Sequence, residues 1–149
     1  MISKILVATD GSKTSQKAAA YAVDLAKQLK ASMIALSVID KRLYVAEAGF
    51  ASKTATQTTE SIEDYLTETA KGYAREVEKL CDQSGVPCSL CVKMGYPVEE
   101  IAQEAKRSKA QLIIMGSRGR SAFSATILGS VSYGVLHNDK SIPVLIVRD

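Results

Sequence analysis

The chain has 149 residues, of which 46% are hydrophobic and 23% charged, with a formal net charge of +3. This length suits one domain, residues 1–149, and the composition is ordinary for a soluble globular protein. The charge is too small and too dispersed to indicate a nucleic-acid partner, and no apolar run approaches the roughly 18 residues of a membrane span.

The first third of the chain predicts two buried strands joined by a helix. Ile2–Thr9 is apolar and β-branched, as a buried strand is, and Asp10-Gly11-Ser12 then turns the chain. Ser15–Lys30 carries alanines and leucines at helical spacing, and Met33–Ile39 is a second short apolar strand.

The middle of the chain predicts a long connection followed by a helix, a strand and a second helix. Lys41–Thr59 shows no periodicity and is longer than most connections, which indicates a lid or mobile loop. Glu60–Ser84 has the apolar stripe of a long amphipathic helix, made up of Ile62, Leu66, Ala70, Tyr73, Val77 and Leu80. Ser89–Lys93 predicts a third strand, and Val98–Ser108 predicts a helix with acidic residues first and basic residues last.

The last part of the chain predicts a strand, a loop, a helix and a strand. Leu112–Met115 is a continuous apolar run, typical of a strand that is buried on both faces. A loop with several glycines follows, then a helix that ends near Asn138 and a final strand over Ile142–Val147. Alternation of strands and helices indicates an α/β fold, in which a parallel sheet is covered by helices on both faces.

Two predicted strands end in residues that could contact a ligand. Asp10 follows the first strand, and Gly116 ends the fourth. The carboxyl ends of parallel strands share one edge of the sheet, and ligands bind there at a switch in strand order. Asp10 is therefore a candidate contact for a nucleotide or a divalent ion, or else a residue that shapes the turn.

The glycine loop itself suggests a phosphate site. Gly116, Gly119 and Gly129 expose peptide N–H groups, and Ser130 stands where the following helix begins. The alternative is that the glycines mark turns and a close contact between helix and sheet, and the spacing alone favours neither interpretation. Arg118 and Arg120 either pair with phosphates or are simply solvated.

The spacing G-x2-G-x9-G-S resembles the nucleotide signature of the universal stress protein family, in its ATP-binding branch. Ile5-Leu6-Val7-Ala8-Thr9-Asp10-Gly11-Ser12 and Ile142-Pro143-Val144-Leu145-Ile146-Val147 are similar to the first and last strands of that family. The resemblance covers essentially the whole chain. It implies an open five-stranded parallel sheet of order 3-2-1-4-5, with a Rossmann-like fold of the adenine nucleotide alpha hydrolase type.

The resemblance also implies which residues bind the nucleotide. Met115 would line the crevice between the residues that contact adenine and ribose and the residues that contact the phosphates. Many ATP-binding members carry proline at position 8 and a histidine or similar residue at position 37, where this chain has Ala8 and Ser37. Adenine and ribose would contact Ala8, Thr9, Asp10 and Val38, and the phosphates would contact Gly116, Gly119, Gly129, Ser130 and Val131.

The function that follows is an ATP-binding switch or stress-response regulator. ATP, or ADP or AMP, would be the ligand, with Mg²⁺ or Mn²⁺ as a candidate ion; the residues indicate no catalytic group and no metal site of their own. The alternatives are a slow ATPase or phosphotransferase and a nucleotide-free dimeric interaction module. The resemblance implies a homodimer through Val144–Val147, and a protein partner of unknown identity is expected.

Three cysteines complete the interpretation. An odd count with no visible signal peptide indicates a reducing compartment, so a cytoplasmic location is expected. Cys88 and Cys91 have CxxC spacing, but residues three apart on a strand point to opposite faces, so they could not chelate one ion. They and Cys81 are expected to act as small buried hydrophobic residues.

Overall fold

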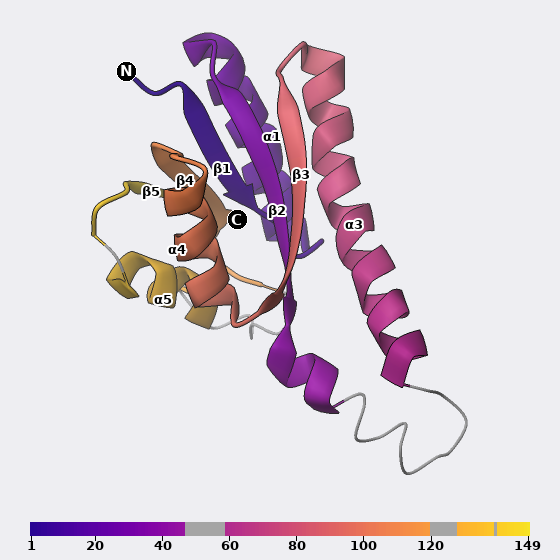
Figure 1. Ribbon diagram of the computed structural model, residues 1–149. Coiled ribbons are helices and arrows are strands. Elements are labelled where there is room, and N and C mark those ends of the chain that lie inside the picture. The colour runs from indigo at the N-terminus through magenta and orange to yellow at the C-terminus, as the bar shows by residue number, and fades with distance from the viewer. Residues whose placement is uncertain (47–58, 120–127, 139) are drawn as a thin grey trace.

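A five-stranded sheet lies at the centre of the protein (Figure 1). The structure is a computed structural model that describes residues 1–46, 59–119, 128–138 and 140–149. Every strand pair is parallel and the order is β3-β2-β1-β4-β5, so the order implied by the resemblance is confirmed. The strands are β1 Lys4–Ala8, β2 Ser32–Asp40, β3 Cys88–Gly95, β4 Leu112–Gly116 and β5 Val144–Val147.

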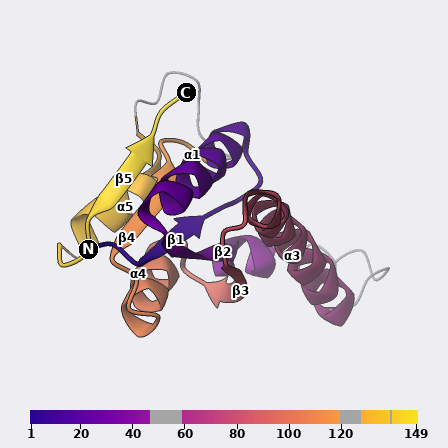
Figure 2. The ribbon, with the colours of Figure 1, turned by 90° about the horizontal axis from the view of Figure 1, so that it is seen from above.

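Helices cover both faces of this sheet, as Figure 2 shows from above. Residues of α1 and α3 pack on one face and residues of α4 and α5 on the other. The α/β fold predicted from the alternating pattern is therefore confirmed. The helices are α1 Lys13–Leu29, α3 Thr59–Ser84, α4 Pro97–Arg107 and α5 Ser130–Asn138.

Two hydrophobic layers hold the helices to the sheet because side chains alternate along each strand. In β1, Ile5 and Val7 point to the face of α1 and α3, whereas Leu6 points to the face of α4 and α5. All three side chains are fully buried. The inner face of α1 consists largely of alanines, which let this helix approach the sheet closely.

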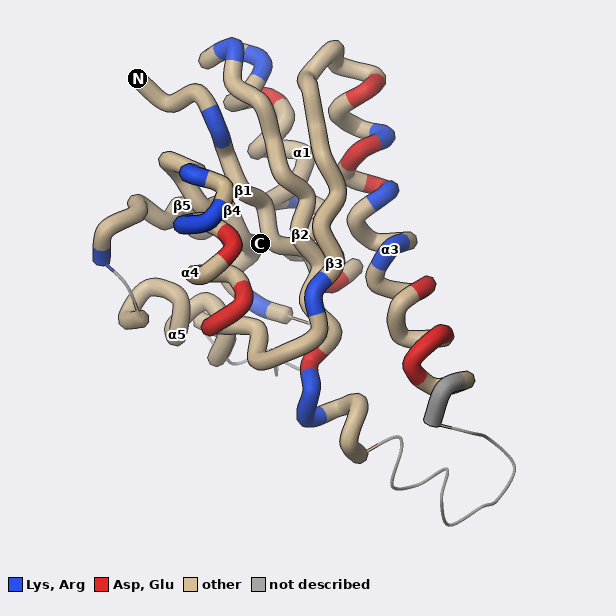
Figure 3. The backbone as a smooth tube through the Cα atoms, viewed as in Figure 1, with Lys and Arg blue, Asp and Glu red and all other residues tan. Residues whose placement is uncertain are grey.

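The α3 helix is long and carries both signs of charge on its outer side. Figure 3 shows acidic residues alone in the first turns of α3 and residues of both signs along the rest of it. Its inner stripe includes Ala74, Val77 and Cys81, which are buried, whereas Leu80 is exposed although the sequence pattern placed it on the stripe. None of the helices in the described ranges is long and apolar enough to cross a membrane.

The long connection predicted over Lys41–Thr59 is shorter in the structure. Residues 41–46 are helical, and Thr59 already belongs to α3. Asp40 begins the short helix because its Oδ1 accepts a hydrogen bond from the Arg42 backbone N at 3.0 Å. A helix of this length shows too few repeats for a periodicity to predict it. The remaining part of the connection, residues 47–58, lies outside the described residues.

Candidate functional site

A cavity of about 550 Å³ opens at the carboxyl ends of β1, β2 and β4. Its walls come from both faces of the sheet, since α3 supplies one side and α4 and the start of α5 supply the other. Strand order runs from β1 through β2 to β3 on one side and from β4 to β5 on the other, so it reverses between β1 and β4. Open parallel sheets bind ligands at the carboxyl ends of the strands beside such a reversal.

The ten residues named from the sequence all line this cavity. They come from three segments that are far apart in the chain and meet because β1 lies between β2 and β4. Their contact with a ligand stays a prediction. The residues are Ala8, Thr9 and Asp10 at the end of β1 and just after it; Val38 in β2; and Met115, Gly116, Gly119, Gly129, Ser130 and Val131 in and after β4.

Asp10 faces the glycine loop directly. Its Oδ1 accepts a hydrogen bond from Ser12 N at 3.0 Å, which keeps the side chain in place within the turn. A Cβ built on Gly119 would lie 2.8 Å from Asp10 Oδ2. Because that separation is shorter than a normal contact, a side chain at position 119 would force the Asp10 carboxylate to move.

The three glycines of the loop do different things. A Cβ on Gly116 would meet the side chain and backbone of Thr14 at 2.8–3.0 Å, so this glycine lets α1 pack against β4. Gly129 N donates a hydrogen bond to Ser117 O at 2.6 Å, so this amide is already engaged within the protein. The N–H of Gly129 is therefore not free for a phosphate in this conformation, and a contact between Gly129 and a phosphate stays a prediction. The following amides, of Ser130 and Val131, stand at the start of α5.

Hydroxyl groups line the floor of the cavity. Thr9 Oγ1 and Ser15 Oγ lie 3.3 Å apart, and Ser132 Oγ donates to Gly116 O at 2.7 Å. Ser37 is only 2% exposed, and its hydroxyl has no hydrogen-bond partner within the described ranges. A buried polar group without a partner is costly, and a polar ligand in the cavity would satisfy it.

The wall that α3 provides was not found from the sequence. Tyr73 packs so closely on Gly11 that a Cβ there would lie 2.2 Å from the ring. Gly11 also has φ of +78°, a conformation that favours glycine. Periodicity put Tyr73 on the inner stripe of the helix, but only the packing of α3 beside β2 places it at a cavity. Leu66, Thr69 and Ala70 line the same wall.

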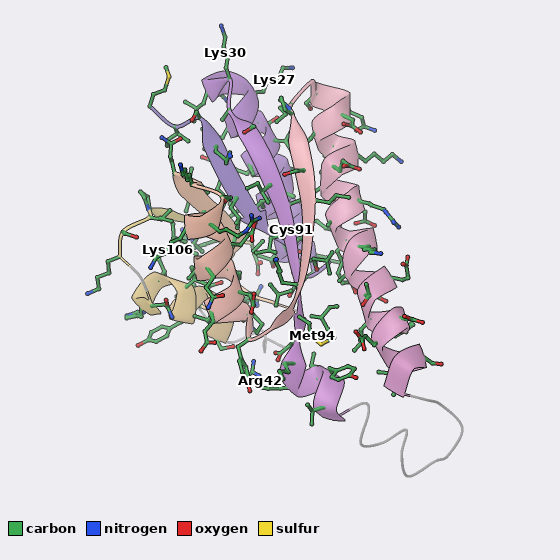
Figure 4. The ribbon with its side chains drawn as sticks, in the orientation of Figure 1. Lys27, Lys30, Arg42, Cys91, Met94 and Lys106 are labelled. Atoms are coloured by element: carbon green, nitrogen blue, oxygen red, sulfur yellow. The ribbon has the colours of Figure 1, made fainter. Side chains whose placement is uncertain are left out.

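Besides Asp10, two acidic and two basic side chains set the charge around the cavity. Asp40 accepts from Arg42 Nε at 3.0 Å and pairs with Arg42 Nη2 at 2.8 Å; Figure 4 labels this arginine on the short helix. Burial raises the pKa of Asp40, but the hydrogen bonds from Arg42 outweigh it and hold the pKa below its usual value. Arg118 lines the cavity and pairs with Asp149, which also accepts from Thr14 Oγ1 at 2.8 Å. Arg120, the other loop arginine considered, lies outside the described residues.

This arrangement fits a ligand with one apolar, hydrogen-bonding end and one anionic end. Val38, Met115 and Ile101 offer an apolar surface on the side of α4 and α5, and Ser37, which follows the phase of Met33 and Ala35 in β2, lines the same cavity from the side of α1 and α3. The start of α5 offers a positive dipole end close to Gly119. The described residues contain no group of three or more His, Cys, Asp or Glu that could hold a metal. A divalent ion would therefore need the ligand's own phosphates beside Asp10, which is the usual way that Mg²⁺ is bound with nucleotides.

Comparison with known proteins finds the family of this chain and the same fold elsewhere. Residues 1–148 match the universal stress protein family. The universal stress protein MJ0531 of Methanocaldococcus jannaschii is 33% identical over 145 residues, which cover 97% of this chain and 81% of that protein.

Solved structures agree with this match. The structure of the hypothetical protein MJ0577 superposes with a TM-score of 0.81 at 30% identity and covers 100% of this chain and 97% of its own. A universal stress protein solved in complex with cAMP has a TM-score of 0.66 at 25% identity and covers 99% of this chain and 97% of its own.

Proposed function

This chain belongs to the universal stress protein family, and we propose that it binds an adenine nucleotide in the cavity at the carboxyl ends of β1, β2 and β4. One observation carries the proposal: ten residues chosen from sequence in three separate segments all line one cavity. The cAMP bound to a relative at 25% identity supports the choice of an adenine ligand.

The base and the phosphates take different parts of the cavity in this proposal. Adenine lies against Ala8 and Val38, with the Ser37 hydroxyl available to one of its polar atoms. The phosphates lie along Gly119 and the start of α5, and Arg118 and an ion beside Asp10 offset their charge. The ion is Mg²⁺ or Mn²⁺, and ATP has the longest anionic tail to occupy this region.

The proposed role is that of a switch. A ligand shifts a protein between two states only if it binds one of them more tightly. Tyr73 of α3 and the loop after β4 border the same cavity, so a bound nucleotide contacts elements from both faces of the sheet at once. The proposal assigns no catalytic residue.

A homodimer through β5 completes the proposal. This strand is at the edge of the sheet, and its four residues, Val144–Val147, are half-buried. An edge strand presents backbone groups and apolar side chains that a second copy can cover across a two-fold axis.

Calorimetry on nucleotide-free protein tests the binding proposal. We expect heat on titration with ATP and Mg²⁺, and weaker binding for Gly119→Ala, since the new methyl group occupies the space between Asp10 and the loop. Gly119 suits this test better than Gly116 or Gly129, where a Cβ would meet backbone atoms and disturb the fold. Gly72→Ala is the matched control because nothing lies within 4 Å of the added atom. Absence of heat with the wild-type protein would contradict the proposal.

A further inference from the structure

Three sulfur atoms meet at the other end of α3, where this helix turns back into β3. Cys81, in the last turn of α3, is 0% exposed, and its Sγ lies 3.8 Å from Met33 Sδ. Met33 is the register partner of Cys88, the first residue of β3. Both cysteines pack in the same hydrophobic layer as Met33. The two thiols therefore share one side of the sheet.

The backbone holds the two cysteines in this arrangement. Val86 N donates to Cys81 O at 2.9 Å, which closes the turn between helix and strand. Met33 N donates to Pro87 O at 2.8 Å, which fixes the residue just before Cys88 against β2. The segment between the cysteines is thus a hydrogen-bonded turn, which keeps Cys81 and Cys88 near each other with their side chains in the same hydrophobic layer.

The two thiols differ in access and in acidity. Cys88 is half-buried, and so more accessible than the fully buried Cys81, because β3 is at the edge of the sheet. A hydrogen bond from Cys81 lowers the pKa of Cys88, against the opposing effects of burial and of Glu78 and Asp82. The same hydrogen bond raises the pKa of Cys81, and burial and the two carboxylates raise it further. Thiolate character is what makes a cysteine reactive, so Cys88 is the accessible nucleophile and Cys81 its buried neighbour.

We propose that Cys88 and Cys81 form a peroxide-sensitive pair, in which Cys88 is oxidised first and Cys81 resolves it as an intramolecular disulfide. In the first step the Cys88 thiolate attacks one oxygen of hydrogen peroxide, the O–O bond breaks, and Cys88 sulfenic acid and hydroxide form. In the second step Cys81 sulfur attacks the Cys88 sulfur, the S–O bond breaks, and water leaves with the Cys81 proton. In total the two thiols lose two hydrogen atoms and peroxide is reduced to two molecules of water.

Cys91 provides a control within the same strand. It lies on β3, where Figure 4 labels it, but it packs in the layer of α4 and α5, on the opposite side of the sheet from Cys88. Burial raises the pKa of Cys91, and the nearby carboxylate of Glu104 raises it further. Cys91 is half-buried like Cys88 yet lacks a second thiol on its side of the sheet within the described ranges.

Mass spectrometry after treatment of the folded full chain with hydrogen peroxide tests the pair. We expect the mass to fall by two hydrogen atoms, and free thiols counted after unfolding to drop from three to one. Fragmentation should place the bond between residues 81 and 88 and leave Cys91 reduced. Dithiothreitol should restore all three thiols.

Two variants separate this result from general oxidation. Cys91→Ser should form the same bond at an unchanged rate. Cys88→Ser, a change of one atom at a half-buried position, should abolish the mass loss and leave Cys81 unreacted. A bond between two chains through Cys88, oxidation of Cys91 before Cys88, or accumulation of sulfinic acid at Cys88 would each overturn the proposal.

Discussion

Asp10 Oδ2 and the backbone of Gly119 are so close that a Cβ on Gly119 would lie 2.8 Å from the carboxylate. The two residues belong to loops that follow β1 and β4, more than a hundred positions apart in the chain. If an anionic ligand lies along the glycine loop after β4, a cation between it and Asp10 is required on electrostatic grounds.

Asp10→Asn therefore tests the role of a divalent ion. The amide oxygen can still accept from Ser12 N, so the turn should survive, but the ion loses a charged ligand. We expect the affinity for ATP in Mg²⁺ to fall about tenfold, or roughly 1.4 kcal/mol, and the difference between Mg²⁺ and EDTA to shrink. Calorimetry with both buffers measures this. An unchanged Mg²⁺ dependence would show that Asp10 acts in the turn alone.

Ser37→Ala tests where the base lies. The buried hydroxyl has no partner in the described part of the chain, so its removal costs the free protein little and costs the complex one hydrogen bond. We expect about tenfold weaker binding of ATP and unchanged binding of inorganic tripolyphosphate. Ser89→Ala, at an exposed position of β3, is the control. If the variant binds ATP and tripolyphosphate with equally reduced affinity, Ser37 does not recognise the base.

Gly11→Ala tests the contact between the first turn and α3. Its positive φ should cost about 1–2 kcal/mol of unfolding free energy, and overlap with the Tyr73 ring about 1–3 kcal/mol more. Gly85→Ala is the matched control because it shares the positive φ, +72°, and has nothing within 4 Å. Urea denaturation measures the unfolding free energy. The loss caused by Gly11→Ala should be smaller in a protein that already carries Tyr73→Ala, because the ring that overlaps the new methyl group is gone. Equal costs at positions 11 and 85 would contradict the packing.

Glu104 should make stability depend on pH. It is 3% exposed, and Arg107 Nε donates to its Oε2 at 2.9 Å. The hydrogen bond with Arg107 lowers the pKa of Glu104, although burial opposes it. Because the folded state prefers the charged form, the stabilisation is complete above the ordinary pKa, near 4.3, and is lost as pH falls through the lowered pKa.

Comparison of wild type with Glu104→Gln measures that stabilisation. We expect the variant to unfold with about 1–3 kcal/mol less free energy at pH 7, and the difference to vanish in acid. Glu76→Gln, on the exposed side of α3, should change stability little at either pH. A constant difference between wild type and Glu104→Gln at all pH values would contradict the assignment.

Ile146→Pro tests the dimer. The carbonyls of Pro143 and Val147 accept from Ile113 N and Ser117 N of the β4 side, so the backbone of Ile146 points to the free edge. Proline there removes an outward N–H and leaves the β4 bonds in place. Light scattering should give a dimer mass for wild type and Ile146→Val, and a monomer mass for Ile146→Pro. A monomeric wild type at micromolar concentration would contradict the dimer.

The sequence predicted helices and strands well where the apolar periodicity and the residues that end an element, such as glycine and proline, marked the same segment. The buried strand at Leu112–Gly116 and the helix ending at Ser84 each have an apolar pattern that is followed by glycine. Their predicted bounds differ little from those in the structure. Strand order came from the resemblance, because the local pattern of one strand carries no information about its neighbours. The short helix at 41–46 was missed, although Asp40 is a suitable residue to start it.

The sequence likewise predicted only some of the residues that line the site. Residues at strand ends and in the glycine loop could be named because glycine, aspartate and their spacing carry a local signal. Tyr73 could not, since its place at the cavity depends on how α3 packs beside the sheet. Gly129 shows the converse: its type was informative, but only the structure shows that its N–H is bonded to Ser117 O.

A crystal structure of the protein grown with ATP and Mg²⁺ tests the central claim most directly. The account predicts density for adenine beside Val38 and Ser37, and for phosphates between Gly119 and the start of α5, with an ion near Asp10. ATP bound elsewhere, or a cavity without nucleotide at millimolar ATP, would contradict it.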